Sequence, residues 1–96
     1  MPENNNHISI EIPESFFMQE SLEIRKKYME DVNETSIVTL DFAKTQYLDS
    51  SGLGLMFMII DRIKKNPEQL IAKNINSSVL RLLELAFIDK FLTIRK

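Results

Sequence analysis

Two adjacent serines followed by two glycines lie where a strand pattern changes to a helix pattern. The segment reads Asp49-Ser50-Ser51-Gly52-Leu53-Gly54. A serine hydroxyl in this position can be phosphorylated, and a helix N-terminus favours the resulting anion through its unpaired N–H groups and positive dipole end. Asp49 can cap the helix, and it could also orient the serine hydroxyl or meet a cation on a modifying enzyme. The segment therefore predicts either a modification site or a simple capping turn.

The two glycines of the segment indicate a need for backbone access rather than for helicity. A glycine inside a helix costs about 1 kcal/mol relative to alanine, yet Gly52 and Gly54 both fall in the expected first turn. Without Cβ atoms at these positions, a kinase could bring a nucleotide phosphate close to Ser51. The pattern is thus typical of a surface that a second macromolecule approaches.

A strand and a helix must hold this segment in place. Residues 36–42 are rich in β-branched side chains, which predicts a buried strand. A helix is expected over about residues 52–65, and it ends before Asn66-Pro67 because proline disfavours a helical conformation in the preceding residue. The apolar residues with helical spacing, which we expect to face the sheet, are Leu53, Met56, Phe57, Ile60 and Ile63.

Two further apolar residues of this helix, Leu55 and Met58, are expected to point away from the sheet, on the side of Gly54 and Arg62. Large apolar side chains beside the serines suggest a docking patch, and methionine adapts readily to a partner's shape. Two alternatives stay open. A neighbouring helix could cover both residues, or they could be isolated exposed apolar side chains, which are common.

The N-terminal third of the chain predicts a strand and a helix. Ile8, Ile10 and Ile12 alternate with polar residues, which indicates a strand with one buried face that ends at Pro13. A helix should run from a cap at Ser15, or at Glu14, to about Glu30. Its apolar arc comprises Phe17, Met18, Leu22, Ile24, Tyr28 and Met29. Arg25 lies within this arc, where we expect a snorkelling or ion-paired side chain.

The C-terminal third continues the alternation of strands and helices. Residues 70–75 form the third expected strand, Ser77 caps a third helix, and residues 92–95 form the last strand. On the third helix we expect one shared face made of Val79, Leu82, Leu83 and Ala86. The order β-α-β-α-β-α-β predicts a single small α/β domain with a mostly parallel four-stranded sheet. This domain should span residues 7–96, after a flexible tail at residues 1–6.

Composition excludes several classes of function. The net charge of −2 argues against nucleic-acid binding, because phosphate contacts need a basic face. No apolar run approaches the roughly 20 residues of a membrane span, and the N-terminus lacks a signal-peptide pattern. The chain has no cysteine, which excludes disulfides and thiolate zinc sites. We therefore expect a cytoplasmic protein without membrane insertion.

The motifs of enzymes and of cofactor sites are weak or incomplete. A serine hydrolase needs a base, and the single histidine, His7, lies at the start of the first expected strand. Gly52-Leu53-Gly54 lacks the third glycine of a dinucleotide loop, and no phosphate-loop lysine follows. Asp41 and Asp49 could approach each other at strand ends, although caps are a simpler role for them. We thus expect no catalytic residue, no cofactor and no metal, and we do not expect an enzyme.

With this order of elements, the motif at residues 49–54 resembles that of STAS domains, specifically of bacterial anti-sigma factor antagonists. The likeness covers residues 8–95, and the segment from Leu82 to Lys90 is also similar to the family's passage from helix to last strand. The resemblance implies that Ser51 is phosphorylated by a partner that is both an anti-sigma factor and a serine kinase. It also implies a serine phosphatase that reverses the modification, and we expect a monomer.

The chain departs from the larger members of that family. They have an extra N-terminal strand, a glycine pair after the second helix, and a fourth helix, whereas Asn66-Pro67-Glu68 stands here in the place of the glycine pair. Partner surfaces built from those segments are therefore not expected. Two other roles remain open: a phosphorylation-controlled scaffold for another signalling output, and an accessory subunit of a lipid-transport complex in which Ser51 is never modified. Ser50 could also compete with Ser51 as the modified residue.

Overall fold

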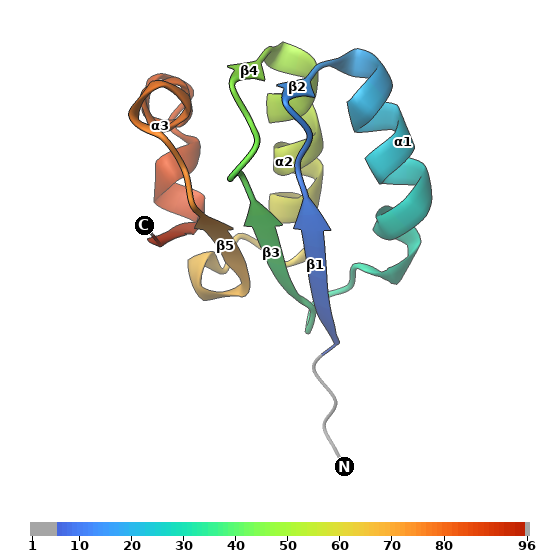
Figure 1. Cartoon of the computed structure of the whole chain (residues 1–96). Helices are drawn as coiled ribbons and strands as arrows, with labels where there is room; N and C mark the ends of the chain where they lie inside the picture. The colour runs from blue at the N-terminus through green and yellow to red at the C-terminus, as the bar shows by residue number, and fades with distance from the viewer. Residues whose placement is uncertain (1–5, 96) are drawn as a thin grey trace.

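The sheet of the computed structural model, which describes residues 6–95, has four strands in the order β1-β3-β5-β6. Every neighbouring pair of strands is parallel. The strands are β1 (His7–Glu11), β3 (Ile37–Asp41), β5 (Leu70–Lys73) and β6 (Thr93–Arg95). The expected small α/β domain with a parallel sheet is therefore confirmed (Figure 1).

Within the described residues three α-helices accompany the sheet, and α2 lies between the other two in Figure 1. They are α1 (Met18–Tyr28), α2 (Ser50–Arg62) and α3 (Ser77–Leu85), with short 3₁₀ turns at Met29–Asp31, Pro67–Gln69 and Ile88–Phe91. Alternate strand side chains are buried, namely Ile8, Ile10, Val38, Leu40, Leu70 and Ala72. Because successive strand residues point to opposite faces, one face of the sheet carries the hydrophobic core.

A second, two-stranded sheet separates the first strand from the first helix. It pairs β2 (Ser15–Phe16) with β4 (Tyr47–Leu48) in parallel. The expectation that Ser15 or Glu14 caps the first helix is therefore wrong. The Glu14 carbonyl accepts hydrogen bonds from the backbone N–H groups of Gln46 (2.9 Å) and Tyr47 (3.0 Å), and Phe16 is fully buried. This pairing keeps the chain extended, so that α1 begins only after Phe17.

The buried face of α1 differs from the apolar arc expected from the sequence. The side chains of Met18 and Leu22 are 64% and 53% exposed, whereas Ser21 and Ile24 are buried. Ser21 and residues of α2 line one small cavity. Met18 and Leu22 line the same cavity, so they stand on the side that faces α2 although they are largely exposed. The burial expected for these two residues of the arc is therefore wrong.

Asn76, and not the expected Ser77, caps α3. Its side-chain oxygen accepts a hydrogen bond from the Val79 N–H (2.8 Å), while its amide nitrogen donates to the Thr45 carbonyl (2.9 Å). An asparagine amide can do both at once, since it has an acceptor and two donors. The cap therefore also ties α3 to the loop before β4. Leu82 is 38% exposed, so it lies at the edge of the face that Val79 and Leu83 bury.

Asn6, which we expected in the flexible tail, is hydrogen-bonded into the domain. Its side-chain amide donates to the Asp31 carbonyl (2.7 Å), and its side-chain oxygen accepts from the Ser36 hydroxyl (2.7 Å). Asn6 therefore belongs to the folded part of the chain. The rest of the expected tail, residues 1–5, lies outside the described residues.

Candidate functional site

The first turn of α2 begins at a well-formed cap. The Asp49 carboxylate accepts hydrogen bonds from the backbone N–H groups of Ser51 (2.9 Å) and Gly52 (3.4 Å). The Asp49 N–H in turn donates to the Phe16 carbonyl (3.5 Å), which fixes the turn to β2. Capping is thus one role of Asp49. Within residues 6–95, its carboxylate has no hydrogen bond to the Ser51 hydroxyl.

The two serines occupy different surroundings. Ser50 is exposed, whereas Ser51 is half-buried and lines a cavity of about 220 Å³ between α1 and α2. Ser51 shares the α1-facing side of α2 with Leu55 and Met58, which line the same cavity. The Ser51 hydroxyl has no hydrogen-bond partner within the described part of the chain. The hydroxyl is therefore not engaged by another described residue, and it lies at the edge of this cavity.

The two glycines differ in what surrounds them. A Cβ atom at Gly52 would lie 2.6 Å from Leu48 Cδ1 and 2.7 Å from the Phe16 carbonyl oxygen, closer than real Cβ atoms come. Packing alone therefore requires glycine at position 52. A Cβ atom at Gly54 would meet nothing within 4 Å. Only Gly54 leaves open space beside the serines, so the expected need for access fits this position alone.

The face that α2 presents to the sheet is rotated relative to the expectation. Leu55 is only 4% exposed, and Met58 is half-buried against the core. Phe57 is 44% exposed and does not face the core. The inward orientation expected for Phe57 is therefore wrong, and Leu55 is not an exposed docking residue. The alternative that a neighbouring helix covers Leu55 is correct, because α1 packs beside α2 and adds a second buried side.

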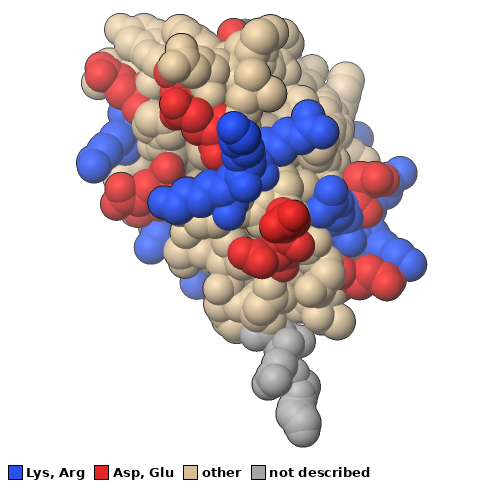
Figure 2. All heavy atoms as spheres, turned by 90° about the vertical axis from the view of Figure 1, so that its right-hand side faces the viewer, with Lys and Arg blue, Asp and Glu red and all other residues tan. Residues whose placement is uncertain are grey.

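Exposed aromatic side chains flank the serine end of the molecule. Phe17 is 40% exposed and Tyr47 is 53% exposed. Tyr47 pairs with Ser15 in the β2–β4 ladder, and Phe17 follows β2 directly. Figure 2 shows that this end of the molecule, at the top, is largely uncharged on the face it displays. The sequence pattern did not predict the exposure of Phe17, which we expected in the apolar arc of α1.

His7 lies at the opposite end of the sheet from Ser51. It pairs with Ile37, the first residue of β3, whereas α2 follows the strand ends at the other edge (Figure 1). The structure therefore does not bring a histidine base to either serine. Hydrolase chemistry of the serine–histidine kind has no support in this arrangement.

Asp41, the other strand-end carboxylate, is held by local hydrogen bonds. It accepts from the Asn74 side-chain amide (3.0 Å) and the Ala43 backbone N–H (3.0 Å). The Asn74 hydrogen bond, and after it that of Ala43, lowers the pKa of Asp41 below its ordinary value. Between residues 6 and 95, no group of three or more His, Cys, Asp or Glu side chains could hold a metal ion.

A model of the STAS domain family matches residues 1–96, the whole chain. The chain belongs to the STAS domain family. Its four-stranded parallel sheet and three helices are compatible with the STAS fold. STAS domain proteins are generally non-enzymatic regulatory modules, and membership supports a general signalling role like that of the anti-sigma factor antagonists.

The helices of this STAS domain are short. None of those within the described residues is both long and apolar enough to cross a membrane.

Proposed function

We propose that this STAS domain is an anti-sigma factor antagonist controlled by phosphorylation of Ser51. In the unmodified state it binds an anti-sigma factor that has serine kinase activity, which releases a sigma factor. Phosphorylation of Ser51 ends this binding, and a serine phosphatase restores it. Family membership supports the general role.

The observation that carries the proposal is the position of the Ser51 hydroxyl. It lies at the second residue of α2, without a protein hydrogen bond among residues 6–95, and near the open space beside Gly54. A kinase active site needs such an unoccupied hydroxyl and room for a nucleotide phosphate. Ser51 offers both, whereas a purely structural capping turn requires neither.

The accessible residues of the motif define the proposed partner surface. Ser50 and Gly54 are exposed, and Leu53 and Met58 are half-buried. Gly52 and Leu55 are buried, so they support this surface from beneath and do not touch the partner. Asp49 is exposed, but its carboxylate already accepts hydrogen bonds from two backbone N–H groups. Its proposed role is therefore to cap the helix and to place a negative charge near Ser51.

Phosphorylation would change binding much more than folding. A phosphoserine adds about −1.5 to −2 charges and three acceptor oxygens. Next to the Asp49 carboxylate, this charge would make the end of the molecule strongly negative, and a closely packed partner would lose affinity through repulsion and desolvation. The dipole of α2 favours the phosphate by about 0.3–1 kcal/mol, so phosphorylation should not destabilise the folded domain.

The direct test is phosphorylation of the purified chain by the candidate kinase with ATP, followed by mass spectrometry. We expect one phosphate on Ser51, which Ser51→Ala abolishes and Ser50→Ala leaves in place. The melting temperature of the phosphorylated protein should stay close to that of the unmodified one. A phosphate on Ser50 alone would contradict the assignment, and an unlabelled chain that co-purifies with a transporter ATPase would favour the lipid-transport alternative.

A further inference from the structure

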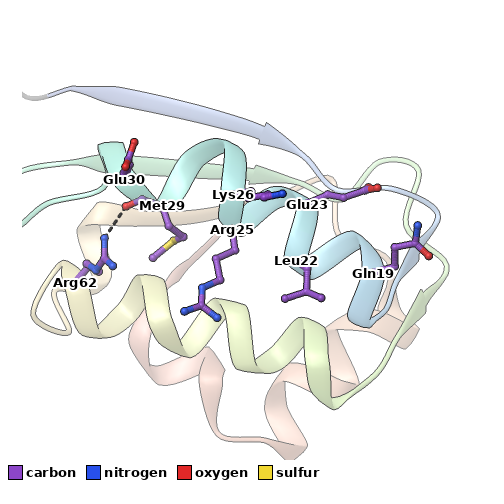
Figure 3. A pocket seen from close by; sticks show the side chains of 8 residues that line it. All are labelled: Gln19, Leu22, Glu23, Arg25, Lys26, Met29, Glu30 and Arg62. Atoms are coloured by element: carbon purple, nitrogen blue, oxygen red, sulfur yellow. Dashed lines mark hydrogen bonds between the residues drawn. The ribbon is translucent and has the colours of Figure 1, made fainter.

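A groove runs between α1 and α2, lined by a matching stripe of side chains on each helix. The stripe of α1 is Met18, Leu22, Arg25 and Met29, and that of α2 is Ser51, Leu55, Met58 and Arg62. Cavities of about 780 Å³ and 220 Å³ lie along it, and Leu22 and Arg25 line both of them. The two cavities are therefore parts of one groove, which extends from Ser51 to Arg62. Further polar residues line the larger cavity, namely Gln19, Glu23, Lys26 and Glu30. Figure 3 shows the residues that line the larger cavity, between α1 and α2.

The apolar part of this groove is rich in methionine. Met18, Met29 and Met58 line it, which makes three of the five methionines of the chain. Met18 and Leu22 are 64% and 53% exposed, although they stand on the side that faces α2. Flexible methionine side chains are frequent where a protein must fit the shape of a bound peptide. An aligned apolar surface of this kind indicates a binding groove rather than isolated exposed residues.

Arg25 places an unpaired positive charge in the middle of the groove. Figure 3 shows its side chain extending from α1 toward α2, while that of Glu30 points away from α2. Within residues 6–95, no carboxylate forms an ion pair with Arg25. Arg62 differs, because its guanidinium donates a hydrogen bond to the Met29 carbonyl (2.6 Å). Arg25 is thus available to a carboxylate that the chain itself does not supply.

A buried hydroxyl near the serine end of the groove also lacks a partner. Ser21 is only 7% exposed, and its Oγ atom has no hydrogen-bond partner among the described residues. Ser21 lines the same cavity as Ser51 and Arg25. Buried polar groups in native proteins are nearly always hydrogen-bonded, so an unpartnered one is a place where a bound group can supply the missing bond.

We propose that this groove binds an amphipathic helix of a partner protein. The apolar face of that helix lies against Met18, Leu22 and Met58, and a carboxylate near its middle pairs with Arg25. From Met18 to Met29 the groove spans about 16 Å at 1.5 Å per residue, which matches about three helical turns of a partner. Arg25 has no ion-pair partner among the described residues, and the larger cavity is lined by three cations and two carboxylates, which favours an acidic helix over a basic one.

The groove also couples partner binding to the phosphorylation of Ser51, and this coupling rests on the function proposed above. Ser51 and Arg25 line one cavity. A phosphate on Ser51 would compete with the partner's carboxylate for Arg25 and would repel it. The same modification would therefore weaken binding both at the exposed end of the molecule and along the groove.

The first experiment places a photo-crosslinking amino acid at Leu22 in the full chain, in its native host. Leu22 is largely exposed, so the fold tolerates the change. We expect a crosslink to a protein segment that forms an acidic amphipathic helix, whereas the same amino acid at Lys27, which does not line the groove, gives none. Crosslinks only to a second copy of this chain, only to lipid, or to nothing would overturn the proposal.

The second experiment measures binding of a synthetic peptide with the crosslinked sequence to the unmodified protein. We expect Arg25→Glu to weaken binding about tenfold or more, because it replaces a charge-assisted pair by repulsion. Lys27→Glu is the matched control, since both residues are cations in the last turn of α1, and it should change binding less than about twofold. A peptide with lysine in place of the central acidic residue should bind Arg25→Glu again. Equal losses for both variants, without this rescue, would refute the pairing.

The third experiment separates the groove from the phosphorylation switch. Protein that carries phosphoserine at position 51, made by genetic incorporation without the kinase, should bind the same peptide about tenfold more weakly. Unchanged affinity would refute the connection between Ser51 and Arg25. Because the second experiment uses unmodified protein, a failure of the kinase to label Ser51 would contradict the proposed function and leave the groove in place.

Discussion

The first turn of α2 has an inner side and an outer side, and its two glycines mark the difference between them. Gly52 is packed so tightly against Phe16 and Leu48 that no Cβ atom fits, whereas Gly54 faces open space. The inner side therefore holds the turn on the fold, and the outer side is available to other molecules. Identical residues two positions apart thus serve stability in one case and access in the other.

The strongest test of this contrast is Gly52→Ala. Overpacking costs about 1–3 kcal/mol or more, and the gain of about 1 kcal/mol in helix propensity offsets only part of it. The Phe16 carbonyl, which a new Cβ atom would approach to 2.7 Å, belongs to a paired strand and cannot yield easily. We expect a melting temperature lower by roughly 5–10 °C, measured by circular dichroism. A variant as stable as the parent would show that the inner side is not tightly packed.

Asp49→Ala should have the next largest effect. It removes the carboxylate that caps two N–H groups of the turn, and loss of such a cap costs about 1 kcal/mol. Asp49→Asn is the matched control, because asparagine caps equally well and removes only the charge. Denaturant unfolding should show the loss for alanine and little change for asparagine. Equal losses would mean that the charge, and not the cap, stabilises the turn.

Gly54→Ala should change stability and binding in opposite directions. Alanine at this open helical position gains up to about 1 kcal/mol of helix propensity, and no contact opposes it. The added methyl group lies beside the proposed approach to Ser51, so the rate of phosphorylation by the kinase should fall. The two measurements are thermal unfolding and phosphate incorporation with time. An unchanged rate would show that the outer side is not the approach surface.

Ser50→Ala should produce the smallest change. Ser50 is exposed at the first residue of α2, and surface substitutions of this kind stay within about 0.5 kcal/mol. Thermal unfolding should therefore match that of the parent chain, and Ser51 should still be phosphorylated. A clear loss of stability would mean that the outer side also supports the turn, which would weaken the distinction between the two sides.

The periodic segments of the chain were predictable. The alternation of Ile8, Ile10 and Ile12 marks β1, and the β-branched run marks β3, because both patterns depend on local spacing alone. The two-residue strands β2 and β4 are too short to show any period. They exist because residues 15–16 pair with residues 47–48, and a contact between distant segments leaves no local signal.

Details of caps and helix orientation were less predictable. Asn76 and Ser77 are both favourable caps, and the hydrogen bond of Asn76 to Thr45, a residue far away in the sequence, decides between them. The buried side of α2 differs from the predicted one for a related reason. The prediction from the apolar spacing assumed that α2 packs against the sheet alone. In the structure α2 packs against both the core and α1, so that Leu55 is buried and Phe57 is not.

The sequence determined where the candidate site lies in the order of strands and helices. A serine pair at the junction of a strand and a helix, in a parallel α/β domain of the STAS family, follows from residue order and local propensity. Only the tertiary structure decided which glycine is required for packing, which serine lies in the groove, and which arginine lacks a partner. These properties depend on the contacts between α1, α2 and β2, and such contacts form only when residues distant in the chain come together.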